Sequence, residues 1–297
     1  MTHVREYDNG AKDKTFSLNA LQKIQRLALK FCCTALPPIG LKVALYHFTN
    51  TRKRRPYNLL DLPPQLQSRK IAYRNGHIVT HSWGHGEKIV YLVHGWESNS
   101  NVMKAFISPL IQQGYKVVAF DMPAHGLSSN QATHLGDFSA TLEFVISIYG
   151  KPFGIVAHSF GGTASVLLLR AQTQLLPSKL CLIAPMKSLD SHLQVFNTIT
   201  GLPEAIMDKL LTKLKKQYAL EAKKTDITRL IQSVPVPGLL IHDKDDRLIP
   251  IEVGDQLAKA WDGSRYIKTQ SLGHRNILKD PFVIQQVTDY MLDRHRS

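Results

Sequence analysis

The sequence predicts an α/β protein in which helices cover both faces of a mostly parallel, doubly wound sheet. From residue 88 onward, short apolar runs rich in β-branched residues alternate with segments of helical periodicity. These runs are apolar throughout rather than at every second position, as in strands buried on both faces. A chain of 297 residues with 43% hydrophobic and 20% charged residues has the composition of a soluble globular protein.

A basic segment precedes the predicted sheet. Residues 1–70 hold thirteen Lys or Arg residues but only four Asp or Glu residues. An apolar segment at 41–48 leads into the basic cluster Arg52–Arg55. We therefore expect residues 1–66 to form a basic, helical extension. From residue 16 to 36, apolar residues recur at helical spacing, opposite the basic ones: Leu21, Ile24, Ala28, Phe31 and Ala35.

Two interpretations of this extension remain open. It packs on the rest of the protein as an additional helical layer, or it contacts an anionic membrane through residues 16–55. Packing is favoured because the apolar side of an amphipathic helix in a soluble protein usually faces its own core. A nucleic-acid-binding arm is not expected, because the apolar segment at 41–48 and its basic cluster show no aromatic interleaving beyond Tyr46 and Phe48.

Neither a secretory signal nor an uncharged apolar run of about 18 residues is present in the sequence. The cysteines Cys32, Cys33 and Cys181 have no metal-ligand spacing. These features predict a cytoplasmic protein, or one peripheral to the inner face of a membrane, with no cofactor and no bound metal. The sequence does not indicate an oligomeric state.

The predicted core begins with a hairpin and continues as strand and helix in alternation. Asn75-Gly76, a strong hairpin signal, joins strands at 70–74 and 77–83. Further strands are expected at 88–93, 115–120, 153–157, 180–184, 238–242 and 265–269, with helices at 101–113, 137–149, 163–170, 253–261 and 283–294. Residues 186–234 interrupt this alternation with helical segments alone. We therefore expect a core of residues 67–185 and 235–297 that carries a helical cap.

The stretch 153–162 has the pattern of a reactive serine at a sharp corner. An apolar strand breaks abruptly at Ser159, and a helix follows. The small residues Ala157 and Gly161, two positions to either side, leave the space that such a strained turn requires. The serine lies at the N-terminus of the next helix, where negative charge on oxygen is favoured.

A serine hydroxyl attacks only when a base removes its proton, and that base needs a carboxylate partner. Both must come from the carboxyl ends of other strands, where ligands bind in open parallel sheets. Asp246 and His274 occupy such positions, the first after the strand at 238–242 and the second after the strand at 265–269.

Four motifs in this order resemble those of the α/β-hydrolase family over residues 70–295. They are His94-Gly95-Trp96, Asp121-Met122-Pro123-Ala124-His125-Gly126-Leu127-Ser128, the Ser159 corner, and the pair of loops with Asp246 and Gly273-His274. The resemblance implies Ser159 as nucleophile, His274 as base and Asp246 as its partner, with an oxyanion hole made by the backbone N–H groups of Trp96 and Phe160.

Several residues keep alternative interpretations. The family places its acid three residues before a hydrophobic-Pro pair, here Ile249-Pro250, which selects Asp246 over Asp243 and Asp245. Asp190 is the fallback acid. Repulsion among the three neighbouring aspartates is expected to raise the pKa of one of them, whereas a metal site there is disfavoured. His94 and His125 are expected to organise loops, and His158 receives no role.

These features predict a serine hydrolase that cleaves a small carboxylic ester or thioester through an acyl-enzyme. Acyl transfer, perhydrolysis and carbon–carbon bond hydrolysis on the same triad are alternatives. A non-catalytic binding protein is another, and so is a membrane-associated lipid hydrolase, which would differ from a soluble esterase by its N-terminal segment. The cap would set the shape of the substrate. Its lysines suggest an anionic substrate, although a solvated surface is favoured: Lys209, Lys213, Lys215 and Lys216.

Overall fold

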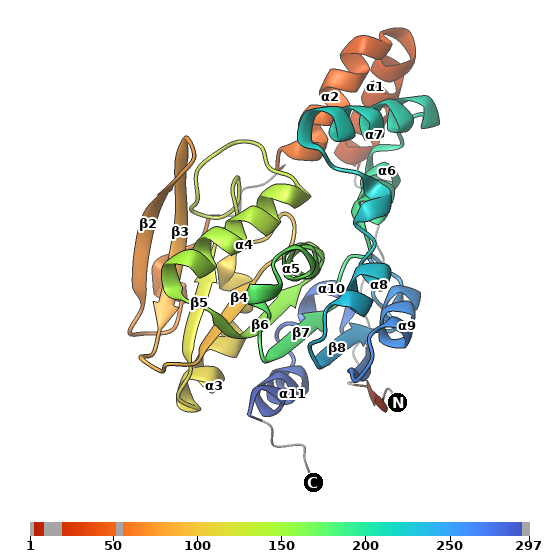
Figure 1. Cartoon of the computed structure of the whole chain (residues 1–297). Helices are drawn as coiled ribbons and strands as arrows, with labels where there is room; N and C mark the ends of the chain where they lie inside the picture. Colours follow the sequence, from red (N-terminus) through yellow and green to blue (C-terminus); the bar gives the residue numbers. More distant parts are fainter. Residues whose placement is uncertain (1–2, 9–19, 52–55, 293–297) are drawn as a thin grey trace.

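The computed structural model describes residues 3–8, 20–51 and 56–292, and it is built around a nine-stranded sheet (Figure 1). The strand order is β1-β9-β8-β7-β6-β4-β5-β3-β2, and only the pairs β2–β3 and β3–β5 are antiparallel. This confirms the predicted fold class. The strands are β1 (His3–Asp8), β2 (Gln67–Tyr73), β3 (Gly76–Trp83), β4 (Ile89–Val93), β5 (Lys116–Phe120), β6 (Pro152–His158), β7 (Lys179–Ile183), β8 (Gly238–Asp243) and β9 (Arg265–Gln270).

Helices cover both faces of the sheet, so each face has its own apolar core. In β4, Tyr91 and Val93 point into the core beneath α4, α5, α8 and α9, whereas Val90 and Leu92 point into the core beneath α3 and α11. Both sets are buried, which explains the uninterrupted apolar sequence of this strand. The helices of these two layers are α3 (Ile107–Gln112), α4 (Leu135–Tyr149), α5 (Phe160–Ala171), α8 (Ile227–Leu230), α9 (Ile251–Ala260) and α11 (Pro281–Met291).

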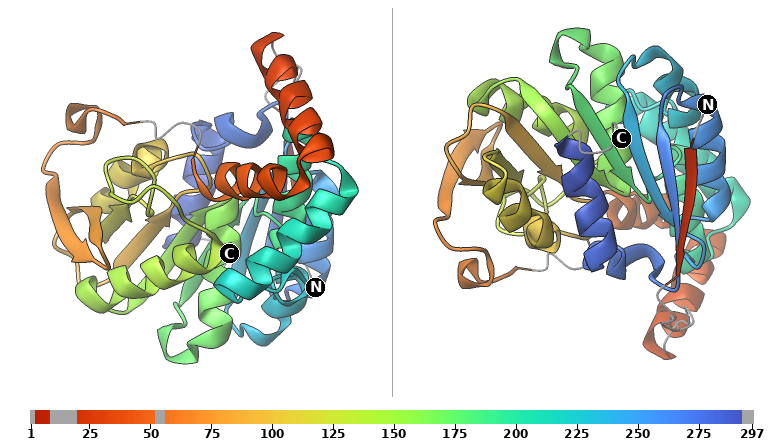
Figure 2. Two further views of the ribbon diagram at one scale, coloured as in Figure 1. Left: turned by 90° about the horizontal axis from the view of Figure 1, so that it is seen from above. Right: turned by 90° about the horizontal axis from the view of Figure 1, so that it is seen from below.

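The first strand lies where only helix was expected. Residues 3–8 form β1, which pairs in parallel with β9 at one edge of the sheet, with His3 opposite Arg265 (Figure 2, right). The prediction of an entirely helical extension is therefore wrong for this segment. An edge strand presents a row of unpaired backbone N–H and C=O groups, and β1 satisfies those of β9.

Two helical segments lie together at one end of the molecule (Figures 1 and 2). The helical insert between β7 and β8 contains α6 (Leu189–Thr200), α7 (Glu204–Tyr218) and α8, as expected. The N-terminal helix pair consists of α1 (Ala20–Ala35) and α2 (Pro37–Thr49). Cys33 and Ala44 of this pair form a small core with Leu202 and Ile206 of the insert.

The helix pair thus packs, but not through the predicted side of α1. Ile24 and Phe31, which were expected to face the core, are exposed, whereas Cys33 on the other side is buried. The packing interpretation is therefore wrong about which side of α1 is buried, because α1 is apolar on two sides and the periodicity does not show which one meets a neighbour. Residues 16–19 and the basic cluster Arg52–Arg55 lie outside the described residues.

Candidate active site

Ser159 occupies a tight corner between β6 and α5. Its φ of 53° and ψ of −124° are strained for a residue with a side chain. A Cβ on Gly161 would lie 2.4 Å from the carbonyl oxygen of His94, and one on Gly95 would lie 2.9 Å from the Cβ of Ser159. The backbones therefore approach one another so closely that only glycine fits at these two positions.

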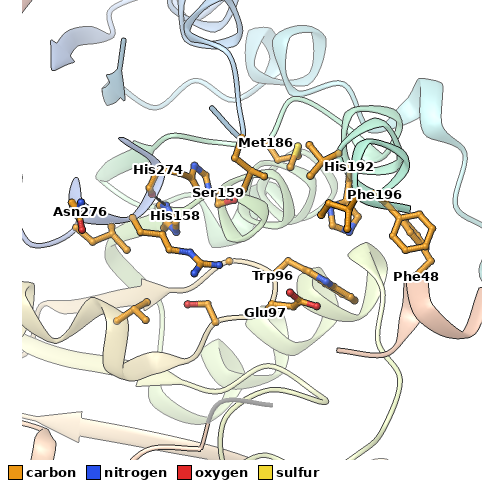
Figure 3. A pocket seen from close by; sticks show the side chains of 18 of the residues that line it. Phe48, Trp96, Glu97, His158, Ser159, Met186, His192, Phe196, His274 and Asn276 are labelled. Carbon is orange, nitrogen blue, oxygen red and sulfur yellow. Dashed lines mark hydrogen bonds between the residues drawn. The ribbon is translucent and has the colours of Figure 1, made fainter. Parts of the chain in front are cut away.

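Ser159, His274 and Asp246 form one chain of hydrogen bonds (Figure 3 shows the first two residues). The distance from Ser159 Oγ to His274 Nε2 is 3.0 Å, and that from His274 Nδ1 to Asp246 Oδ2 is 2.7 Å. A carboxylate can only accept, so Nδ1 carries the proton and Nε2 is the acceptor for the serine hydroxyl. The structure therefore brings together the three residues that the sequence singled out.

Asp246 is buried, yet several donors stabilise its charge. Burial alone raises its pKa, but the hydrogen bond from His274 and the electrostatic interaction with that ring outweigh this effect and hold the pKa below its usual value. The backbone N–H groups of Leu248 and Ile249 each donate to Oδ1 at 2.9 Å. Asp246, which faces His274, is therefore not an aspartate whose pKa is raised by repulsion within the cluster.

Asp243 anchors the loop that carries His274, a role that the sequence did not reveal. It is fully buried and accepts hydrogen bonds from the backbone N–H groups of Leu272 and Gly273, at 3.2 and 2.9 Å, and from the hydroxyl of Thr269 at 2.6 Å. Within the described ranges, no three His, Cys, Asp or Glu side chains are grouped in a way that could hold a metal ion.

Asp190, the fallback acid, lies away from this chain of hydrogen bonds. It is exposed in the first turn of α6, where Oδ2 accepts from Gln194 at 3.1 Å. The geometry therefore selects Asp246 as the partner of His274.

Two backbone donors lie beside the serine. Phe160 is the first residue of α5, whose opening N–H groups have no partner within the helix. Trp96 follows β4 and Gly95, which lies against Ser159. In the part of the chain that the structure describes, the N–H groups of Trp96 and Phe160 have no acceptor.

Two buried histidines hold the loops around these donors, as expected. His94 donates from Nδ1 to the carbonyl of Gly95 at 2.7 Å and accepts the N–H of Met122 at Nε2 at 3.1 Å. His125 accepts the N–H of Glu97 at 3.0 Å. Burial lowers the pKa of His94, so it remains neutral and can accept in this way.

His158 contacts the loop that carries the candidate base, His274. Its Nε2–H donates to the backbone carbonyl of His274 at 2.9 Å, and the two rings lie 4.7 Å apart. Burial and the neighbouring His274 hold the pKa of His158 well below its usual value, so the ring stays neutral. His158 thus positions the loop of His274 without adding a second charge.

A cavity of about 440 Å³ opens above Ser159 (Figure 3). The insert contributes His192 and Phe196, while α2 contributes His47 and Phe48. No motif marks these residues, because they reach the site only through the packing of separate helices. The apolar part of the lining also includes Trp96, Met186, Val195, Ile199, Leu248 and Leu278.

A serine at a strand-to-helix corner, with a histidine and an aspartate supplied by later strand ends, is the arrangement of α/β-hydrolases. Residues 84–229 match the family model described as serine aminopeptidase, S33. A pimeloyl-[acyl-carrier protein] methyl ester esterase of Neisseria meningitidis is 25% identical over 229 residues, which cover 64% of this chain and 72% of that protein.

A serine hydrolase-like protein of Danio rerio is 29% identical over 133 residues, which cover 41% of this chain and only 36% of that protein. Among solved structures, a bacterial membrane phospholipase A superposes with a TM-score of 0.61 at 15% identity, over 93% of this chain and 97% of the other. The chain belongs to the α/β-hydrolase family.

Proposed function

We propose that this protein is a serine hydrolase that cleaves a carboxylic ester or thioester through an acyl-enzyme on Ser159. The observation that carries the proposal is the hydrogen-bonded chain from Ser159 through His274 to Asp246. The ester part of this proposal is supported by the Neisseria relative described above, a methyl ester esterase. The low pKa of Asp246 keeps a negative charge beside His274, which favours proton transfer to the imidazole.

In the first step, Ser159 Oγ attacks the acyl carbon while its proton passes to His274 Nε2. The negative charge that develops on the carbonyl oxygen is stabilised by the N–H groups of Trp96 and Phe160. Removing a donor of this kind typically costs about 10²–10³ in rate. The bond to the leaving oxygen or sulfur then breaks, and His274 returns the proton to the leaving group.

In the second step, water replaces the leaving group and attacks the acyl-enzyme. His274 takes a proton from the water as the new bond forms, and it then gives this proton to Ser159 Oγ as the acid is released. Attack by an alcohol, an amine or hydrogen peroxide at this stage would yield acyl transfer or perhydrolysis instead. Product identification, rather than the fold, separates these outcomes.

We also propose that residues 186–234 act as a cap, residues 67–185 and 235–297 form the catalytic core, and residues 1–66 are an extension of it. Met186, His192 and Phe196 line the cavity above Ser159, which supports a role of the cap in selecting the acyl group. None of the four cap lysines lines that cavity, which supports their interpretation as a solvated surface.

The experiment is a panel of p-nitrophenyl esters of increasing acyl length, run beside acyl-CoA thioesters. We expect the highest kcat/KM for an apolar acyl chain that fills the cavity, and loss of this activity in Ser159→Ala. A folded wild-type protein that turns over no ester or thioester, or a Ser159→Ala protein with undiminished kcat, would contradict the proposal.

A further inference from the structure

The exposed apolar side chains of this protein are concentrated on the N-terminal helix pair. In the described ranges, six of the nine large hydrophobic side chains that are exposed lie between residues 24 and 46. Ile24, Leu27 and Phe31 follow one another at helical spacing on α1, and they are 63%, 68% and 74% exposed. We call these three residues the apolar stripe. The other three are Leu36, which precedes α2, and Ile39 and Tyr46, which lie on α2.

The stripe faces outward because the opposite side of α1 packs on the helical insert. Leu29 and Cys33, on the other side of α1, pack on Leu202 and Ile206 of the insert. Arg26 reaches across to the carbonyl oxygen of Thr198 on α6, at 3.5 Å. One side of α1 therefore attaches it to the protein, and the stripe on the other side remains without a partner within the described chain.

The positive charge of the segment that carries the stripe favours an anionic occupant. No Asp or Glu residue occurs from residue 14 to residue 60, whereas this stretch contains nine Lys or Arg residues. Arg26, Lys30 and Lys42 are exposed on the helix pair itself. A second copy of this chain would bring the same positive charge to the contact, whereas an anionic lipid surface attracts basic side chains and accepts apolar ones.

The helix pair also forms part of the cavity. α2 supplies His47 and Phe48 to the wall of the cavity above Ser159, and Phe48 is labelled in Figure 3. A lipid surface in contact with the stripe would therefore lie next to an element that lines the site. No helix in the described ranges is long and apolar enough to cross a membrane, so contact through the stripe would be with one face of the bilayer.

We propose that the N-terminal helix pair docks this protein on an anionic lipid surface through the stripe of Ile24, Leu27 and Phe31, and that its substrates are acyl esters held in that surface. The second clause rests on the proposed hydrolase function, whereas the first does not. Binding and hydrolysis are therefore tested separately.

Binding is measured by flotation of the full chain carrying Ser159→Ala with two kinds of vesicle. One contains phosphatidylcholine alone, and the other contains about one third phosphatidylglycerol. We expect flotation with the anionic vesicles, little with the neutral ones, and weaker binding in high salt. Replacing all three stripe residues by serine should lower the partition coefficient by roughly tenfold or more. Ile148→Ser, which removes an exposed apolar side chain from α4, serves as the matched control and should float like the parent protein.

Equal binding by the stripe variant and its parent, or no flotation with either vesicle, would overturn the proposal. So would a dimer in sedimentation analysis that the stripe variant loses while neither protein floats, because the stripe would then contact a second copy. In active protein, the stripe variant should keep its kcat/KM on a soluble short-chain ester but lose activity on a long-chain ester presented in anionic vesicles. Unchanged activity on that vesicle ester would refute the substrate assignment, whatever the flotation shows.

Discussion

At the scale of single residues, hydrogen-bond partners distinguish side chains that the sequence makes look alike. Three aspartates fall within four positions at the end of β8, and each has a different partner. Asp243 accepts the N–H of Gly273 in the loop before His274, and Asp245 accepts the N–H of Ser271 at 2.9 Å. Asp246 accepts a hydrogen bond from the His274 ring. Only Asp246 is therefore placed to orient a base.

The first prediction compares two carboxylates. Asp246→Asn removes the charge that stabilises the imidazolium and can present an N–H to His274, which favours the wrong tautomer. We expect kcat/KM for a p-nitrophenyl ester to fall by about 10³–10⁴. Asp190→Asn, an exposed change on α6, should leave kcat/KM within about twofold of wild type. A larger loss from Asp190→Asn than from Asp246→Asn would refute the assignment of the acid.

At the scale of elements, the site depends on how closely β4, β6 and α5 approach one another. Gly161 lies directly against the carbonyls of Val93 and His94, at the start of the helix that presents the N–H of Phe160. A methyl group at Gly161 would contact backbone atoms, which cannot rotate away. The corner and the backbone donor are therefore expected to move together.

The second prediction tests this contact with Gly161→Ala. We expect the free energy of unfolding to fall by about 1–3 kcal/mol, with a loss of kcat that exceeds any change in KM. Gly136→Ala on α4 is the matched control, because its nearest neighbour is a side-chain atom of His134 at 3.3 Å. It should change the free energy of unfolding by less than about 1 kcal/mol, measured by urea titration. An equal effect of the two substitutions would show that the approach of α5 to β4 is unimportant.

The sequence predicted those elements whose signals are local. The β2–β3 hairpin has a turn dipeptide, the corner at Ser159 has its small neighbours, and the loops of Asp246 and His274 follow apolar strands. β1 could not be predicted in this way, because its pairing with β9 joins segments more than 250 residues apart. The outward face of α1 and the contribution of Phe48 to the cavity depend on helix packing, which periodicity alone does not determine.

At the scale of the whole molecule, the fold buries several histidines in the uncharged form. Burial lowers the pKa values of five of them, so the folded protein resists their protonation, while the unfolded chain takes up protons near pH 6.5. The stability that these neutral histidines contribute is therefore fully present above that pH, and this contribution is lost as the pH falls. The five are His81, His94, His134, His158 and His242.

The third prediction is that the free energy of unfolding, measured by urea titration, is lower at pH 5.5 than at pH 7.5. Asp246 acts in a lower range, because its pKa is depressed in the folded state. Its contribution is present above about pH 4 and disappears only as the pH falls further. Equal stability at pH 5.5 and 7.5 would contradict the assignment of neutral histidines to the folded state.

The central claim is that Ser159 is the nucleophile of a serine hydrolase. The most direct measurement is labelling of the folded protein with a fluorophosphonate, followed by intact mass and peptide analysis. We predict one adduct per chain, located on Ser159, together with no adduct in Ser159→Ala and much slower labelling in His274→Ala. A folded wild-type protein that remains unlabelled, or that carries the adduct on another residue, would contradict the account.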